Sequence, residues 1–128
     1  MSFTVFLGKF SNGEPVDIEV QKLLKVISKY GRIEEGSLGM EFVSNNTELF
    51  ENADFSKSDS SLFCIHRPSN HPELKNLIFD FLSIKGTCYF SQDLDFIKIR
   101  NAKENDFPED MVQHCRTGLT IVKSFTEI

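Results

Sequence analysis

Three histidines are the residues whose side-chain chemistry is easiest to name. His66 and His71 flank a proline, and His114 comes much later in the chain. An imidazole titrates near neutral pH, so two histidines and a lysine contain the groups needed for general acid–base cleavage of RNA. The chain is acidic, however, and contains no loop of the kind that holds phosphate. We therefore interpret the histidines as structural or surface residues, expect no catalytic residues and no enzyme, and rank a histidine nuclease third.

Metal-binding residue types are present, but their spacing does not match a known site. Cys64, His66 and His71 lie close in sequence, yet no fourth ligand follows at a zinc spacing. The acidic pairs at 93 and 95 and at 109 and 110 do not sit in an EF-hand pattern. The sequence therefore predicts no metal and no cofactor.

The cysteines and the N-terminus indicate where the protein works. An odd number of widely spaced cysteines without a CxxC motif favours buried, reduced thiols in a cytosolic protein. The opening MSFTVFLGKF has neither the basic nor the long apolar region of a secretory signal. No run approaches the ~18 apolar residues of a membrane span. We expect a cytoplasmic protein without membrane contact, whose thiols are Cys64, Cys88 and Cys115.

The distribution of charge is the most informative feature. Seven of the 19 acidic residues but only two of the 14 basic ones lie between Arg32 and Asp59, so this stretch carries the whole net charge of -5. Such a surface disfavours direct nucleic-acid binding. Its carboxylates can instead mimic phosphates and steer a cationic protein, with two phenylalanines as apolar anchors. The candidate partner-binding residues are Glu34, Glu35, Glu41, Glu48, Phe50, Glu51, Asp54, Phe55 and Asp59.

The acidic stretch has a plainer interpretation and also a possible extension. In the plainer interpretation it is a solvated loop whose carboxylates serve only solubility. The extension is a second acidic group, which adds to the same surface if the fold places it on the same side. That group consists of Glu104, Asp106, Glu109 and Asp110.

The element around which the chain is organised is a helix between Ser69 and Gly86. Asn70 and Glu73 form a capping box at its start, and Gly86 ends it. Its apolar residues recur at i, i+3, i+4, i+7 and i+8, which predicts a stripe that packs on a sheet. The stripe consists of Leu74, Leu77, Ile78, Phe81 and Leu82.

The remaining pattern predicts one α+β domain over residues 1–128. The expected order is β-α-β-β-α-β-β-α-β, a mainly antiparallel sheet covered by two helices, ferredoxin-like or related. Alternation and turn residues place the elements. They are strands at 3–10, 34–44, 61–67, 87–91, 96–100 and 119–126, helices at 16–30, 69–86 and 108–115, and a long loop at 45–60 with one helical turn near 48–52.

At this point the chain resembles the bacterial immunity proteins of contact-dependent growth-inhibition and other polymorphic toxin systems. The resemblance lies in the opening strand FTVFLGKF, the two capped helices and the acidic stretch EEGSLGMEFVSNNTELFENADF. It implies a non-catalytic protein that occludes the active site of a cognate toxin, often a nuclease with a basic cleft. The second-ranked alternative is a ferredoxin-like regulatory module with an apolar cleft for a small molecule.

Overall fold

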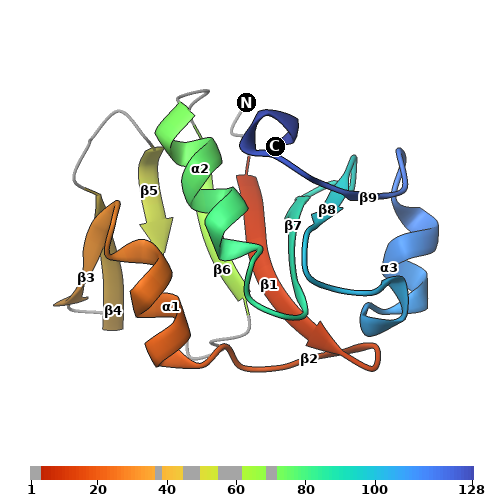
Figure 1. Cartoon of the computed structure of the whole chain (residues 1–128), viewed down its shortest axis with the longest axis horizontal. Coiled ribbons are helices and arrows are strands. Elements are labelled where there is room, and N and C mark those ends of the chain that lie inside the picture. The colour runs from red at the N-terminus through yellow and green to blue at the C-terminus, as the bar shows by residue number, and fades with distance from the viewer. Residues whose placement is uncertain (1–3, 37–38, 45–49, 55–61, 69–71) are drawn as a thin grey trace.

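The structure is a computed structural model that describes residues 4–36, 39–44, 50–54, 62–68 and 72–128 (Figure 1). Its strands are β1 (Thr4–Ser11), β2 (Glu14–Pro15), β3 (Gly31–Gly36), β4 (Gly39–Ser44), β5 (Phe50–Asp54), β6 (Leu62–Pro68), β7 (Thr87–Ser91), β8 (Ile97–Ile99) and β9 (Leu119–Ile121). Its helices are α1 (Val20–Ile27), α2 (Pro72–Phe81) and α3 (Glu109–His114), with short 3-10 helices η1 (Glu104–Asp106) and η2 (Phe125–Glu127).

The main sheet is open and mixed, with the strand order β5-β6-β1-β7-β8-β9. β1 is flanked by β6 and β7 and is antiparallel to both. β8 continues the sheet antiparallel to β7, whereas β9 joins β8 in parallel. β2 folds back on the end of β1, and β3 and β4 form a separate antiparallel hairpin.

The position of α2 follows from this pairing. Since β6 and β7 are both antiparallel to β1, they are parallel to each other and need a crossover connection, which is usually a helix. α2 supplies it by passing over β1, as Figure 1 shows. The predicted stripe faces the sheet, because all five of its apolar side chains are at most 1% exposed. The prediction of a central helix on a sheet is confirmed.

Alternate residues of β1 and β7 divide the core into two clusters, because successive side chains of a strand point to opposite faces. Val5 and Leu7 of β1 and Tyr89 of β7 join the first cluster, under α1 and α2. Phe10 of β1 and Cys88 of β7 join the second, under η1 and α3. Both long helices therefore cover the same face of the sheet, as expected.

The predicted single strand over residues 34–44 is wrong. Gly36 and Gly39 are paired across the β3–β4 hairpin, so the chain reverses between them. Glycine weakens a strand interior and adopts turn conformations easily, which explains why the break falls here. The chain therefore forms a hairpin where the sequence predicted one continuous strand.

The predicted loop over residues 45–60 and its helical turn near 48–52 are also wrong for the part that the structure describes. Phe50–Asp54 forms β5, which pairs with β6 in a register that places Asn52 opposite His66. Backbone pairing at the sheet edge overrides the weak local pattern of a polar segment.

Three element ends differ from the sequence prediction. α1 begins at Val20 rather than near Val16, because the Val16 N–H donates to the Lys9 carbonyl and extends the β1–β2 connection. α2 ends at Phe81, five residues before Gly86. β9 ends at Ile121 and is followed by η2, not by further strand. The α+β class and the mainly antiparallel sheet are confirmed, whereas the ferredoxin-like arrangement stays a prediction.

Candidate functional site

The predicted acidic stretch is spread over three neighbouring strands at one end of the molecule, on the left of Figure 1. Glu34 and Glu35 lie on β3 and Glu41 on β4, and the register pairs Glu34 with Glu41. β5, which lies beside β4, contains Phe50, Glu51 and Asp54. The backbone therefore brings these six predicted residues to one region of the fold.

Part of the predicted binding surface lies outside what the structure describes. Glu48, Phe55 and Asp59 fall outside the described residues, and so do the side chains of the six acidic and aromatic residues on β3, β4 and β5. Binding through this stretch therefore stays a prediction.

The second acidic group does not extend that surface. β5 and β9 form opposite edges of the main sheet. η1 and α3, which carry the second group, lie beside β8 and β9 at the right of Figure 1, away from β3, β4 and β5. The condition for one continuous acidic surface is therefore not met, because the sheet separates its two parts.

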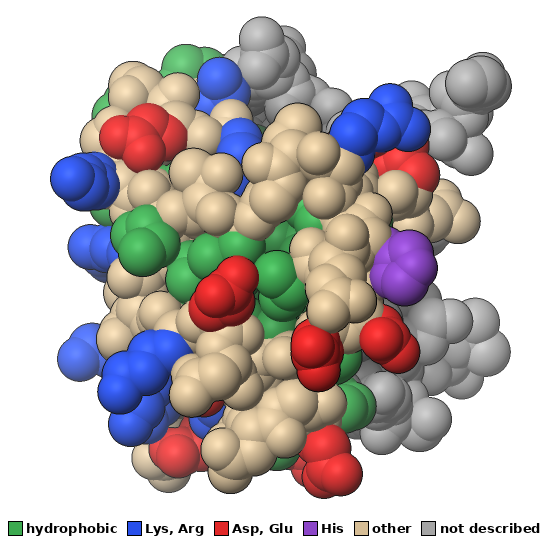
Figure 2. Space-filling view, turned by 90° about the vertical axis from the view of Figure 1, so that its right-hand side faces the viewer, with side chains coloured by type: hydrophobic (Ala, Val, Ile, Leu, Met, Phe, Trp, Pro, Cys, Tyr) green, Lys and Arg blue, Asp and Glu red, His purple; other side chains and the backbone are tan. Residues whose placement is uncertain are grey.

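Two members of the second acidic group, Glu104 and Glu109, instead line a hollow on their own side of the molecule. Figure 2 shows this face, where an apolar centre lies among several acidic side chains. The hollow has a volume of about 690 Å³. It is lined by Asn12 and Gly13 from the β1–β2 turn, Glu104, Asn105 and Phe107 from η1 and the residue after it, and Glu109, Val112 and Gln113 from α3. We call it the acidic hollow.

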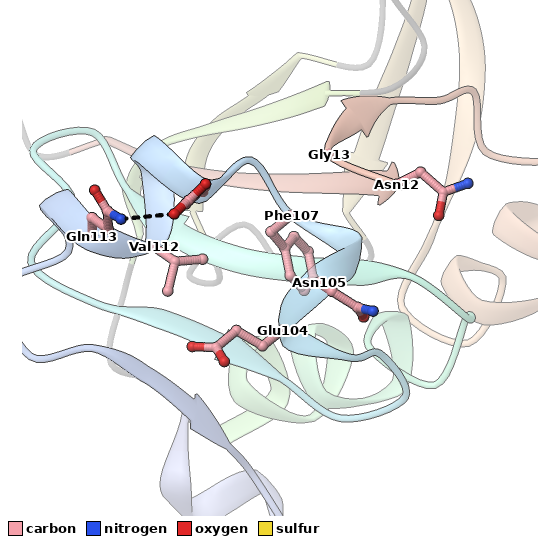
Figure 3. A pocket seen from close by; sticks show the side chains of 8 residues that line it. Asn12, Gly13, Glu104, Asn105, Phe107, Val112 and Gln113 are labelled. Carbon is pink, nitrogen blue, oxygen red and sulfur yellow. Dashed lines mark hydrogen bonds between the residues drawn. The ribbon is translucent and has the colours of Figure 1, made fainter.

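The floor of the acidic hollow belongs to the second core cluster. Phe107 is only 3% exposed, and its ring lies 5.6 Å from that of Phe10. Val112 packs against the same cluster. Figure 3 shows the side chains of Val112, Phe107 and Glu104 lining the same hollow. The apolar floor is therefore held by packing before any partner arrives.

The rim of the acidic hollow carries carboxylates with different degrees of freedom. Glu109 Oε1 accepts a hydrogen bond from Gln113 Nε2 at 3.0 Å, drawn in Figure 3, which fixes its position. The Glu104 carboxylate has no hydrogen bond or ion pair to any side chain that the structure describes. Asp106, which does not line the hollow, accepts from the Lys103 N–H at 3.0 Å through its Oδ2 and so holds η1 together. Neither Glu104 nor Glu109 is paired with a cation that the structure describes. An apolar floor with such carboxylates at its edge suits the aliphatic stem and cationic head of a lysine or arginine.

The two histidines that the structure describes, His66 and His114, lie on different elements. His114 ends α3, is exposed, and its Nδ1 lies 2.7 Å from the Asp110 carbonyl oxygen. His66 lies on β6, opposite Thr4 of β1, and only its backbone is described. His71 lies outside the described residues.

The described thiols have the environment of core residues. Cys88 and Cys115 are both free and buried, whereas the side chain of Cys64 lies outside the described residues. Burial raises the pKa of the Cys88 thiol well above its usual range. Cys115 Sγ lies 3.4 Å from the Gly118 carbonyl oxygen. Cys88 is therefore not present as the reactive thiolate near neutral pH.

The residues that the structure describes include neither a cluster of metal ligands nor a membrane-spanning helix. Among those residues, no group of three or more histidine, cysteine or acidic side chains is arranged to hold a metal ion. No helix found there has both the length and the apolar character needed to cross a bilayer.

The acidic hollow was not predicted, although its parts left signals in the sequence. The second acidic group and the apolar face of Met111, Val112 and Cys115 are visible in the chain. Nothing in the sequence shows that the Asn12–Gly13 turn closes one side of the hollow, which depends on the Gly13 N–H donating to the Asp106 carbonyl at 3.0 Å. That contact joins segments more than ninety residues apart.

Comparison with known proteins gives no relative: no family model, no curated protein and no solved structure matches this chain.

Proposed function

We propose that this protein binds and neutralises a basic protein partner, and that this partner is a cognate toxin of the nuclease type. The observation that carries the proposal is the acidic hollow, which combines a preformed apolar floor with carboxylates that have no internal cation. The resemblance to immunity proteins supplies the kind of partner. The acidic residues of β3, β4 and β5 would add long-range steering from the other end of the molecule.

The hollow favours a protruding lysine or arginine as the anchor from the partner. Its aliphatic stem would cover Phe107 and Val112, and its charged head would lie between Glu104 and Glu109. A charged pair shielded from water by such a floor contributes more than a pair on an open rim, where screening removes most of the attraction. The same carboxylates disfavour anionic ligands, including nucleic acid.

The test begins with a partner captured from the native source on the tagged protein at low salt. The captured polypeptide is then expressed alone, where it should arrest growth, and together with this protein, where growth should resume. The double variant Glu104→Gln/Glu109→Gln should weaken binding by about tenfold or more, because charge-assisted hydrogen bonds contribute about 1.5–3 kcal/mol each. It should also fail to restore growth.

A matched control removes the same charge elsewhere. Asp17 and Glu127 are exposed, and Asp17→Asn/Glu127→Gln changes the net charge equally without touching the hollow. This variant should bind and protect like the original protein. Equal weakening by both double variants would show that only net charge matters, and a captured partner without a basic surface would contradict the proposal.

A small-molecule regulatory role is a second candidate, because the hollow's volume of about 690 Å³ lies in the range of ligand pockets. The ferredoxin-like form of that proposal additionally requires a cleft at a dimer interface. A cationic amphiphile that copurifies with the protein, and is lost in Glu104→Gln/Glu109→Gln without any captured polypeptide, would favour this candidate.

A further inference from the structure

A second surface, beside α1, has the opposite charge. Two adjoining cavities of about 420 and 460 Å³ lie along α1 and the turn that follows α2, and both are lined by Lys22 and Lys85. Lys25 and Lys29 line the first cavity and Lys9 the second. We call the pair of cavities the lysine groove.

The arrangement of α1 accounts for one wall of the groove. Leu23 and Ile27 face the first core cluster and are 4% and 1% exposed. Lys22 and Lys25 are exposed and lie three residues apart on α1, which places them on one side of the helix, and the exposed Lys29 follows in the turn after α1. The wall is therefore a row of ammonium groups and not a single charge.

The opposite wall is set by the turn between α2 and β7. Gly86 has a φ of +81° and its N–H donates to the Asn101 carbonyl at 2.9 Å. Its own carbonyl accepts from the Phe10 N–H at 2.9 Å. Lys85, directly before this fixed glycine, is exposed and lines both cavities.

The acidic side chains that line the groove are already engaged. Asp80 Oδ2 accepts from the Tyr30 hydroxyl at 2.6 Å, and Glu19 Oε1 lies 3.6 Å from Lys22 Nζ. Asp106 accepts from the Lys103 backbone. The other four lysines, Lys9, Lys25, Lys29 and Lys85, make no ion pair with any residue that the structure describes. The lining has five lysines against three carboxylates, so the groove is cationic on a chain whose net charge is -5.

The floor of the groove indicates which anion fits. Val26 and the 6% exposed Ile84 line the first cavity, so the ammonium groups lie beside apolar surface. Unstructured nucleic acid is held by bases stacked on free aromatic rings. Among the residues that the structure describes, no aromatic side chain lines the first cavity, and Phe10, which lines the second, is packed against Phe107.

We propose that the lysine groove binds an acidic polypeptide segment that carries apolar side chains between its carboxylates. Flexible lysine side chains match carboxylates spaced along such a segment, and Val26 and Ile84 receive its apolar side chains. This site is separate from the acidic hollow and takes a ligand of opposite charge. The protein would then contact an acidic segment at the groove and a basic partner at the hollow.

The test uses a short fluorescein-labelled peptide of alternating glutamate and valine, with fluorescence anisotropy as the measurement. The peptide should bind the full chain at low salt and be released as salt is raised. The matching peptide of glutamine and valine should bind at least about tenfold more weakly, since charge-assisted bonds are lost. Lys25→Glu/Lys29→Glu should reduce affinity at least as much, whereas Lys103→Glu/Lys123→Glu, with the same change in charge outside the groove, should have much less effect.

Additional variants test whether a loss of peptide binding comes from misfolding or from the acidic hollow. Lys25→Gln/Lys29→Gln replaces the charge-reversed variant if that variant does not fold, as judged by circular dichroism. Glu104→Gln/Glu109→Gln should leave peptide binding intact, so failure at the hollow does not count against the groove. Equal affinity of the two groove and control lysine variants would overturn the proposal.

Two other outcomes would also overturn it. The first is a single-stranded oligonucleotide that binds more tightly than the peptide with the same dependence on Lys25 and Lys29. The second is absence of peptide binding together with self-association, seen by sedimentation, that Lys25→Glu/Lys29→Glu abolishes. The occupant would then be nucleic acid or a second copy of the chain.

Discussion

The two faces of the main sheet are built from alternate residues of the same strands, but they are covered to different extents. On the first face α1 and α2 leave Val5, Leu7 and Phe81 with no exposed surface. On the second face the cover is η1 and α3, and α3 has only six residues, which corresponds to a length of about 9 Å. Phe10, Phe90 and Met111 consequently stay half-buried there. Both clusters contain fully buried side chains, but half-buried apolar residues make up a larger share of the second cluster among the residues that the structure describes.

The two surfaces at these faces also carry opposite charges. The lysine groove borders the cover of the first face and the acidic hollow lies in the cover of the second. The end of β1 and the turn after it lie between them. Phe10 lines the groove and its N–H donates to the Gly86 carbonyl, whereas Gly13 lines the hollow and its N–H donates to the Asp106 carbonyl. Net charge averages over such surfaces, so it does not predict which ligands a small protein can hold.

Loss of a large side chain should distinguish the faces most strongly. Phe81→Ala should lower the free energy of unfolding by about 3–5 kcal/mol, because it leaves a cavity under α2. Met111→Ala, at the half-buried margin of the second face, should cost about 1–2 kcal/mol, since less apolar surface is lost. Urea denaturation followed by circular dichroism measures both. Equal losses would mean that the two faces contribute equally to stability.

The junction between the faces should be the next most sensitive position. A Cβ on Gly86 would lie 2.8 Å from the Phe10 carbonyl oxygen, at a φ of +81°. Gly86→Ala should therefore cost about 2–4 kcal/mol, combining left-handed backbone strain with overpacking. Gly118→Ala is the control, because Gly118 has a φ of +77° but no atom within 4 Å of the added Cβ. It should cost only about 1–2 kcal/mol, and a similar loss for both would show that the backbone at Phe10 moves aside.

The titration of Tyr89 on β7 should lower the stability of the folded protein at high pH. Burial raises the pKa of Tyr89 to about 12, whereas an unfolded tyrosine titrates near 10. The unfolded state loses its proton first, so this stability is complete below pH ~10 and falls by about 1.4 kcal/mol per pH unit up to pH ~12. Tyr89→Phe should remove this contribution to the fall in the free energy of unfolding at high pH. The contribution from Cys88, on the other face of the sheet, should remain. An unchanged pH profile of urea unfolding would contradict this assignment.

The smallest effect should come from the hydrogen bond at the groove's edge. Burial and Asp80 raise the pKa of Tyr30, and the bond between them is 2.6 Å long. Tyr30→Phe should cost about 1 kcal/mol of stability, because this bond is partly exposed. It should also weaken binding of the glutamate–valine peptide a few-fold, because Asp80 loses the hydrogen bond from Tyr30 and its negative charge then repels the peptide more strongly. Asp80→Asn, which removes that charge, should strengthen peptide binding, and the same direction for both variants would show that Asp80 does not act through its charge.

The sequence predicted the parts of the fold that depend on strong local patterns. The apolar stripe of α2 recurs with the period of a helix, and all five of its members are buried. The β7–β8 hairpin and α3 were likewise found within a few residues. These predictions succeeded because hydrophobic periodicity and turn residues are signals between residues close together in the sequence.

The elements that sequence reasoning missed depend on distant partners. β5 is a strand because β6 offers its edge, and α1 starts late because Val16 bonds to Lys9. The reversal between Gly36 and Gly39 shows the same limit, since two glycines indicate a weakness but not the direction in which the chain turns.

The chain by itself determined the amounts of charge and apolar surface: a net charge of -5, an acidic segment after Arg32, a second acidic group near α3 and three lysines in and just after α1. Only the tertiary structure decided how these are combined. It separated the two acidic groups to opposite edges of the sheet, brought the Asn12–Gly13 turn to η1 and joined Lys85 to the lysines of α1. The physical reason is that strand pairing and packing act between segments far apart in sequence, and these contacts set where each charge lies.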